Sequence, residues 1–164
     1  MKQAVQDAFN EQIKNELYSG YLYLAMAAHF EKENLEGFAK WMRMQALEEL
    51  KHGMRLYDHL VERGAHIELK AIDQPPSSFG TPQAIFEQAL EHEREVTAMI
   101  TRLFELSRDE KDYPSELALQ WFIDEQVEEE DQASRAVEQL RMAGENRAAQ
   151  LMLDRQFGAR THAE

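Results

Sequence analysis

The sequence has no cysteine, only seven glycines and four prolines, and far fewer basic than acidic side chains. Without cysteine there is no disulfide framework, thiolate zinc site or thiol chemistry. The few helix breakers, together with abundant Glu, Leu, Ala, Gln and Met, favour helices. The longest apolar run, residues 21–28, is too short to cross a membrane, and the first residues lack the apolar segment of a signal peptide. We therefore expect a soluble, cytoplasmic, all-α protein.

The excess of acidic residues limits the kinds of molecule that this protein is expected to bind. Acidic residues number 31 and basic residues 18, which gives a formal net charge of −13. This charge argues against nucleic acid and against an anionic membrane surface as partners. An acidic surface concentrates cations, although the same surface would also serve solubility alone. The 164 residues predict a single domain, residues 1–164, with a sizeable core.

Hydrophobic periodicity predicts four long helices and a short fifth one. The expected ranges are 4–33, 38–63, 82–110, 115–144 and 145–157. Gly64 follows the second helix, as glycine commonly does, and Thr81-Pro82 has the pattern of an N-cap followed by a first-turn proline. The first helix places Val5, Phe9, Ile13, Gly20, Tyr23, Leu24 and Ala27 on one expected apolar stripe.

The connections between these helices predict their arrangement. Two are short turns, whereas residues 65–80, with Pro75-Pro76 at their centre, form one long connection. Short turns make neighbouring helices antiparallel, and a long connection can carry the chain to the other end of a bundle. The sequence therefore predicts a four-helix bundle with one long crossover between helices two and three, plus a short C-terminal fifth helix.

A carboxylate and an imidazole share one face of the second helix. Glu49 and His52 are three residues apart, and so they are neighbours on a helix surface. Met42, Ala46 and Leu56 occupy the same face, which places the pair in the apolar stripe. An ionised carboxylate there is costly unless it is paired or binds a metal. Carboxylate and imidazole are ligands for iron, manganese or zinc.

Each of the other long helices also carries an acid on its apolar stripe. These acids are Glu16, Glu93 and Glu129. Counted from the turns, Glu16 and Glu49 differ by ~5–6 Å in height and Glu93 and Glu129 by ~3 Å. A single acid would be read as lying at the edge of its stripe. Four acids at one level cannot share a core as anions without cations, and two divalent metal ions would balance them.

At these residues the chain resembles the haem-free ferritins of bacteria and archaea, over essentially its whole length. The resemblance is carried by residues 10–12, 16–19, 48–52, 91–93, 112–114 and 119–130. It implies a ferritin-like fold and a role in iron storage and detoxification. It also implies ferroxidase activity, in which ferrous iron is oxidised by oxygen at a di-iron centre, and storage of ferric mineral in a cage of twenty-four subunits.

The resemblance also implies roles for individual residues. Glu16, Glu49 and His52 would bind the first iron, and Glu49 would bridge to a second iron held by Glu93 and Glu129. Gln126 would lie close enough to hydrogen-bond bound oxygen. Tyr23 would stand beside the centre, although it reads equally well as a core tyrosine with a satisfied hydroxyl. A third iron site would use Glu48, Glu125, Glu128 and Glu129, with a solvated acidic face as the alternative for Glu48 and Glu128.

Differences in sequence between this chain and other members of the wider superfamily indicate which of those relatives it does not resemble. Bacterioferritins, rubrerythrins and ribonucleotide reductases carry a second E-x-x-H, where this chain has Gln126 and Glu129. Leu50 stands where bacterioferritins have the haem-ligating methionine, so no haem is expected. The remaining histidines, His29, His59, His66, His92 and His162, are not expected to join the site, and His59 is expected to be a packed or edge histidine.

Two other classes of function stay open at this stage. A substrate-oxidising di-metal enzyme on the same bundle would need a pocket, yet large apolar residues such as Phe9, Phe86 and Phe122 fill the stripe near the acids. A metal-free, cytokine-like bundle would not bury four acids, and such bundles usually have two long crossovers.

Overall fold

A computed structural model describes residues 1–159 of the chain, in which five helices and no strand occur. The helices are α1 (Gln3–Lys32), α2 (Glu36–Glu62), α3 (Pro82–Asp109), α4 (Tyr113–Ala143) and α5 (Arg147–Gly158). Their ends lie within two residues of the predicted ones, and the all-α prediction is confirmed. Within this part of the chain, no helix combines the length and apolar character that crossing a lipid bilayer requires.

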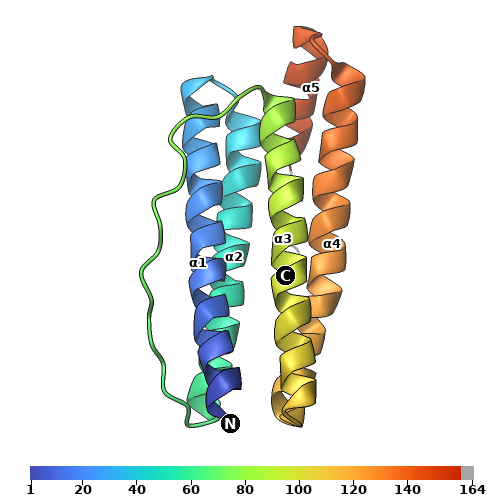
Figure 1. The fold of residues 1–164 in the computed structure, drawn as a ribbon. Helices are drawn as coiled ribbons and strands as arrows, with labels where there is room; N and C mark the ends of the chain where they lie inside the picture. The colour runs from blue at the N-terminus through green and yellow to red at the C-terminus, as the bar shows by residue number, and fades with distance from the viewer. Residues whose placement is uncertain (160–164) are drawn as a thin grey trace.

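The four long helices lie side by side as a bundle, and α5 covers one end of it (Figure 1). The connection between α2 and α3 runs outside α1 along the whole length of the bundle. It carries the chain from the end where α2 finishes to the opposite end, where α3 begins. The predicted single long crossover between helices two and three is therefore confirmed.

Local signals in the sequence set the limits of this crossover. After α2, Gly64 adopts a φ of 61°, a left-handed conformation that glycine reaches without a steric penalty. Before α3, the hydroxyl of Thr81 accepts a hydrogen bond from the amide of Ala84 at 3.3 Å, and Pro82 occupies the first turn.

Asn10 of α1 fixes the crossover against the bundle. Its side-chain amide donates to the carbonyl of His66 at 3.0 Å, and its side-chain oxygen accepts from the amide of Glu68 at 2.9 Å. Asn10 is buried, with 2% of its surface exposed. One side chain therefore satisfies two backbone groups of a segment that has no helical hydrogen bonds of its own.

The beginning of α2 depends on α5 for its cap. Leu35 precedes α2 and supplies no capping side chain, but Asp154 of α5 accepts a hydrogen bond from the amide of Phe38 at 2.8 Å. The two helices approach so closely that a Cβ on Gly37 would lie 1.7 Å from the carbonyl oxygen of Asp154. Glycine is therefore required at position 37 by this contact.

The core consists of two apolar clusters with a polar layer between them. The cluster near α5 includes Tyr23, Phe30, Phe38, Trp41, Phe86, Ala133, Leu140 and Phe157. The cluster at the other end includes Val5, Phe9, Ile13, Leu56, Val96, Ile100, Leu119 and Phe122. On every long helix, the residues between these two sets include a buried acid. The polar layer is therefore enclosed by apolar side chains along the bundle axis.

One part of the predicted apolar stripe on α1 is wrong. Leu24 is 50% exposed, whereas its neighbours Tyr23 and Ala27 are buried. At 100° per residue, Leu24 lies to one side of the stripe. No other part of the described chain covers it completely.

We expect Asp154→Ala to destabilise the bundle by about 1 kcal/mol, because the first turn of α2 would lose its cap. Thermal unfolding followed by circular dichroism measures this effect. Asp154→Asn, which keeps a side-chain acceptor, should recover most of the loss. Equal melting temperatures for Asp154→Ala and the parent protein would contradict the capping role.

Candidate metal centre

The first half of the polar layer comes from α1 and α2. Glu16, Glu49 and His52 each expose 4% of their surface or less. The Nδ1 atom of His52 lies 3.5 Å from a carboxylate oxygen of Glu49 and 3.9 Å from one of Glu16. Ligand atoms of the three residues all lie within 4.8 Å of one another, an arrangement that could hold a metal ion.

The second half comes from α3 and α4. Glu93 and Glu129 are each at most 3% exposed, as is Gln126. The side-chain amide of Gln126 donates to a carboxylate oxygen of Glu93 at 3.2 Å. Glu129 accepts a hydrogen bond of 2.7 Å from Gln45 of α2. The structure thus places the predicted carboxylates of both hairpins in one layer of the core.

Tyr23 of α1 links the two halves of the layer. Its ring is fully buried, and its hydroxyl donates a short hydrogen bond to the carboxylate of Glu93 on α3. Both sequence readings of Tyr23 therefore apply, because it is a core tyrosine whose hydroxyl is satisfied by an acid of the polar layer. Burial and the nearby charge of Glu93 raise the pKa of Tyr23 well above its ordinary value, so it remains a hydrogen-bond donor.

Burial changes the protonation of the layer in the absence of a cation. It raises the pKa of Glu16, and it raises the pKa of Glu49 well above its ordinary value, with further contributions from the charges of Glu93 and Glu16. Burial also raises the pKa of Glu93 to about 7, although hydrogen bonds from Tyr23 and Gln126 oppose the shift. Burial, with Arg55 and Lys51 nearby, lowers the pKa of His52 to about 4. The imidazole is therefore neutral and able to bind a metal.

Three oxygens in this layer have no hydrogen-bond partner in the described structure. They are one carboxylate oxygen of Glu16 and both of Glu49. Buried acceptors are rarely left unsatisfied, because each costs free energy. Hard carboxylate oxygens with one imidazole suit iron and related divalent metals. The unsatisfied oxygens and the neutral imidazole thus fit the predicted metal centre.

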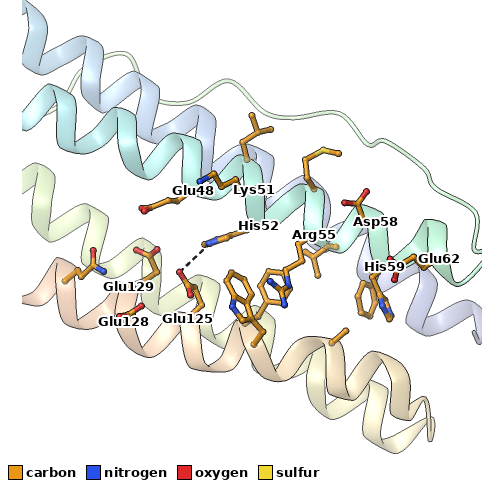
Figure 2. Close-up of a pocket in the computed structure, with 18 residues that line it drawn as sticks. Glu48, Lys51, His52, Arg55, Asp58, His59, Glu62, Glu125, Glu128 and Glu129 are labelled. Atoms are coloured by element: carbon orange, nitrogen blue, oxygen red, sulfur yellow. Dashed lines mark ion pairs between the residues drawn. The ribbon is translucent and has the colours of Figure 1, made fainter. Parts of the chain in front are cut away.

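A groove connects the layer to the surface between α2 and α4 (Figure 2). It encloses about 1150 Å³, and buried His52 and Glu129 form part of its wall. The predicted third-site residues Glu48, Glu125 and Glu128 also line it. Glu48 and Glu125 are half-buried and Glu128 is exposed, so Glu128 matches the alternative of a solvated acid more closely than the other two do.

Three contacts of the layer were not anticipated from the sequence. Gln12 donates to Glu16 at 2.7 Å, Gln45 donates to Glu129, and Trp121 packs edge-on against His52 with ring centroids 5.4 Å apart. Gln12 precedes Glu16 by four residues, a spacing that could have revealed it. Gln45 and Trp121 contact residues of distant helices, which no local pattern reports.

His59 and His92 make their side-chain hydrogen bonds to residues outside the layer. His59 stacks on Phe9 with ring centroids 5.1 Å apart and hydrogen-bonds to Ser115 at 3.0 Å, as expected for a packed or edge histidine. His92 hydrogen-bonds to Ser19 at 2.7 Å. His162 lies outside the described residues.

Known proteins are similar to this chain in both sequence and fold. A family model described as a ferritin-like domain matches residues 6–143. The bacterial non-heme ferritin of Staphylococcus aureus is 38% identical over 158 residues, which cover 96% of this chain and 95% of the relative. The bacterial non-heme ferritin of Bacteroides fragilis is also 38% identical, over 98% of this chain and 99% of that protein.

Solved structures of ferritins have the same fold as this chain. An open-pore ferritin from the hyperthermophilic archaeon Archaeoglobus fulgidus superposes with a TM-score of 0.97 at 44% identity, covering 98% of this chain and 99% of that one. The family match, the sequence identity and the superposition each extend over the helices that carry the polar layer. The chain therefore belongs to the ferritin family, in which iron storage is combined with ferroxidase activity.

Proposed function

We propose that the polar layer is the ferroxidase centre of this ferritin and that it takes ferrous iron as its substrate. Glu16, Glu49 and His52 bind one ion, and Glu93 and Glu129 bind a second. Glu49 bridges the two ions, since it offers two oxygens without hydrogen-bond partners. Those unpartnered oxygens, buried beside a neutral imidazole, are the observation that carries the proposal.

The ligands of this centre and the residues around them suit the binding and oxidation of ferrous ions. Two ferrous ions together supply two electrons to one molecule of oxygen, and carboxylate ligands favour the ferric product. Protons held by Glu49 and Glu93 in the metal-free state leave as the ions bind. Gln126 and Tyr23 hold the Glu93 carboxylate in position and offer hydrogen bonds at the place where oxygen would bind.

The groove favours iron over an organic substrate. Its wall near the centre carries the acids Glu48, Glu125 and Glu128, which attract cations. With Glu129 they form a third iron position on the way from the centre to the mineral. A substrate-oxidising di-metal enzyme is the weaker candidate, because the family match and the relatives that are named non-heme ferritins support iron as the substrate.

Iron storage requires a shell of several subunits. The single chain exposes apolar side chains that could form the contacts between such subunits. Large exposed apolar side chains lie on α1, α2 and the crossover: Tyr21, Leu24, Leu47, Leu50, Leu69 and Ile72. Patches of this kind mark protein–protein contacts. We assign them to subunit contacts in a cage of twenty-four subunits, in which Leu50 provides no haem ligand.

We expect Glu49→Ala and His52→Ala each to abolish the rapid oxidation of ferrous iron. Loss of a direct ligand should weaken metal binding by more than about 100-fold, the upper range for residues that merely support ligands. Stopped-flow absorbance of ferric iron, with size-exclusion mass to verify assembly, measures this. Glu91→Ala and His66→Ala, at exposed positions outside the layer, are matched controls. Rapid oxidation in either centre variant would refute the assignment.

The raised pKa of Glu93 predicts a pH-dependent stability in metal-free protein. Unfolded Glu93 ionises near 4.5 and folded Glu93 near 7, so the folded state binds more protons in between and loses stability as pH rises through 7. Glu93→Gln lacks this proton. Its stability relative to the parent should therefore increase by about 2–3 kcal/mol between pH 5 and 7.5.

Thermal unfolding in the presence of a chelator tests this pH dependence. Glu91→Gln, at an exposed neighbouring position, should track the parent protein at every pH. Zinc ions should restore the stability of the parent at pH 7.5, because a bound cation replaces the lost proton. A constant difference between Glu93→Gln and the parent across this range would show that Glu93 is not protonated in the folded state.

A further inference from the structure

Thr97 of α3 lies beside the polar layer and contacts three groups through one oxygen atom. Its Oγ1 lies 2.6 Å from a carboxylate oxygen of Glu130, 2.9 Å from the backbone carbonyl of Glu93 and 3.2 Å from the side-chain nitrogen of Gln126. Thr97 and Glu130 are half-buried, whereas the two neighbours in the layer are buried. The hydroxyl therefore connects the layer to a carboxylate outside it.

The single proton of this hydroxyl determines the direction of each hydrogen bond. A carboxylate and a backbone carbonyl are acceptors only, so the hydroxyl donates its proton either to Glu130 or to the carbonyl of Glu93. Toward Gln126 the hydroxyl oxygen can then only accept. The atom that Gln126 directs at Thr97 must therefore be its amide nitrogen, because an amide oxygen cannot donate.

This direction determines how Gln126 meets the acid of the layer. The same amide nitrogen lies 3.2 Å from a carboxylate oxygen of Glu93 and 3.3 Å from its backbone carbonyl. A primary amide has two N–H groups, so one can bind Thr97 while the other binds the carboxylate. Tyr23 donates to the second carboxylate oxygen. Both oxygens of Glu93 thus have a donor, whereas those of Glu49 have none among the described residues.

We propose that Thr97 is a positioning residue of the centre, whose hydroxyl keeps the amide nitrogen of Gln126 directed at Glu93. The inference rests on the proposed ferroxidase function and concerns the ion held by Glu93 and Glu129. The nitrogen and oxygen ends of an amide have nearly the same size, so shape alone distinguishes them poorly. Without the hydroxyl the amide can turn over, and its oxygen would then repel the carboxylate that binds the second ion.

Glu130 strengthens this arrangement but is not its only support. A hydroxyl that donates to a carboxylate forms a short, strong hydrogen bond of about 2.5–2.7 Å, and the contact of 2.6 Å from Thr97 to Glu130 has this length. The backbone carbonyl of Glu93 is a second acceptor for the same proton. Loss of the Glu130 charge therefore leaves the hydroxyl able to accept from Gln126, whereas loss of the hydroxyl does not.

Zinc binding to the metal-free protein tests this role without any oxidation step. Thr97→Val removes the hydroxyl and keeps the branched shape of the side chain. Calorimetric titration should show about tenfold weaker binding of one of the two ions, the lower end of the effect for residues that support metal ligands. The step lost in His52→Ala belongs to the other ion and should be unchanged. Thr97→Ser restores the hydroxyl and should restore the affinity.

Two control variants separate the hydroxyl from its surroundings. Thr101 lies one turn farther along α3, at an exposed position, and donates to the carbonyl of Thr97 at 2.8 Å. Thr101→Val makes the same chemical change there and should leave both affinities unchanged. Glu130→Gln keeps an acceptor for Thr97 and should also bind zinc as the parent does. A tenfold loss in either control, equal weakening of both ions in Thr97→Val, or no recovery in Thr97→Ser would overturn the proposal.

A double-mutant cycle tests whether Thr97 acts through Gln126. Gln126→Leu removes the amide, and adding Thr97→Val to it should cause no further loss of zinc affinity. Additive losses would refute the pathway through the amide. Aerobic iron oxidation by the parent protein separates the two hypotheses. Failure of the parent to oxidise ferrous iron refutes the proposed function, whereas normal oxidation by the parent with unaltered zinc affinities in Thr97→Val refutes the positioning role alone.

Discussion

The structure depends on a costly arrangement, four carboxylates buried between two apolar clusters. Apolar packing at both ends of the layer excludes water from Glu16, Glu49, Glu93 and Glu129. In that environment an unpaired anion is unfavourable, so burial raises the pKa of the carboxyl groups of Glu16, Glu49 and Glu93. The same exclusion that makes the empty layer unfavourable increases the free energy gained when a divalent ion enters. The packing of the bundle and its affinity for metal thus have one physical origin.

The fold could be predicted from the sequence because its signals are local. Helical periodicity located the long helices, Gly64 and Thr81-Pro82 marked the ends of the crossover, and one long connection specified the bundle. Leu24 was misplaced because, at 100° per residue, it lies beside the apolar stripe of α1 and not within it. The cap that Asp154 supplies to α2 joins residues 116 positions apart, and no local pattern contains that information.

The candidate centre was predictable for a different reason. Acids on an apolar stripe violate the usual pattern, and counting residues from the turns was enough to place Glu16, Glu49, Glu93 and Glu129 at one height. The residues that contact these acids and His52 were not predictable in this way. Gln45 and Trp121 are ordinary helix residues in the sequence, and only packing between α2 and α4 brings them to Glu129 and His52. The hydrogen bonds that Thr97 makes to Gln126 and Glu130 likewise required the structure.

Few contacts within the polar layer join one hairpin to the other. Helices α1 and α2 supply Glu16, Glu49 and His52, whereas α3 and α4 supply Glu93, Gln126 and Glu129, and only a few polar contacts, such as Tyr23 to Glu93, join the two groups. A bridging pair of ions would therefore act as a cross-link between the hairpins, in the middle of the bundle where no covalent bond connects them. Each cycle of iron entry and departure would tighten and then loosen the subunit, so that its mechanical stiffness would vary with the state of its cargo.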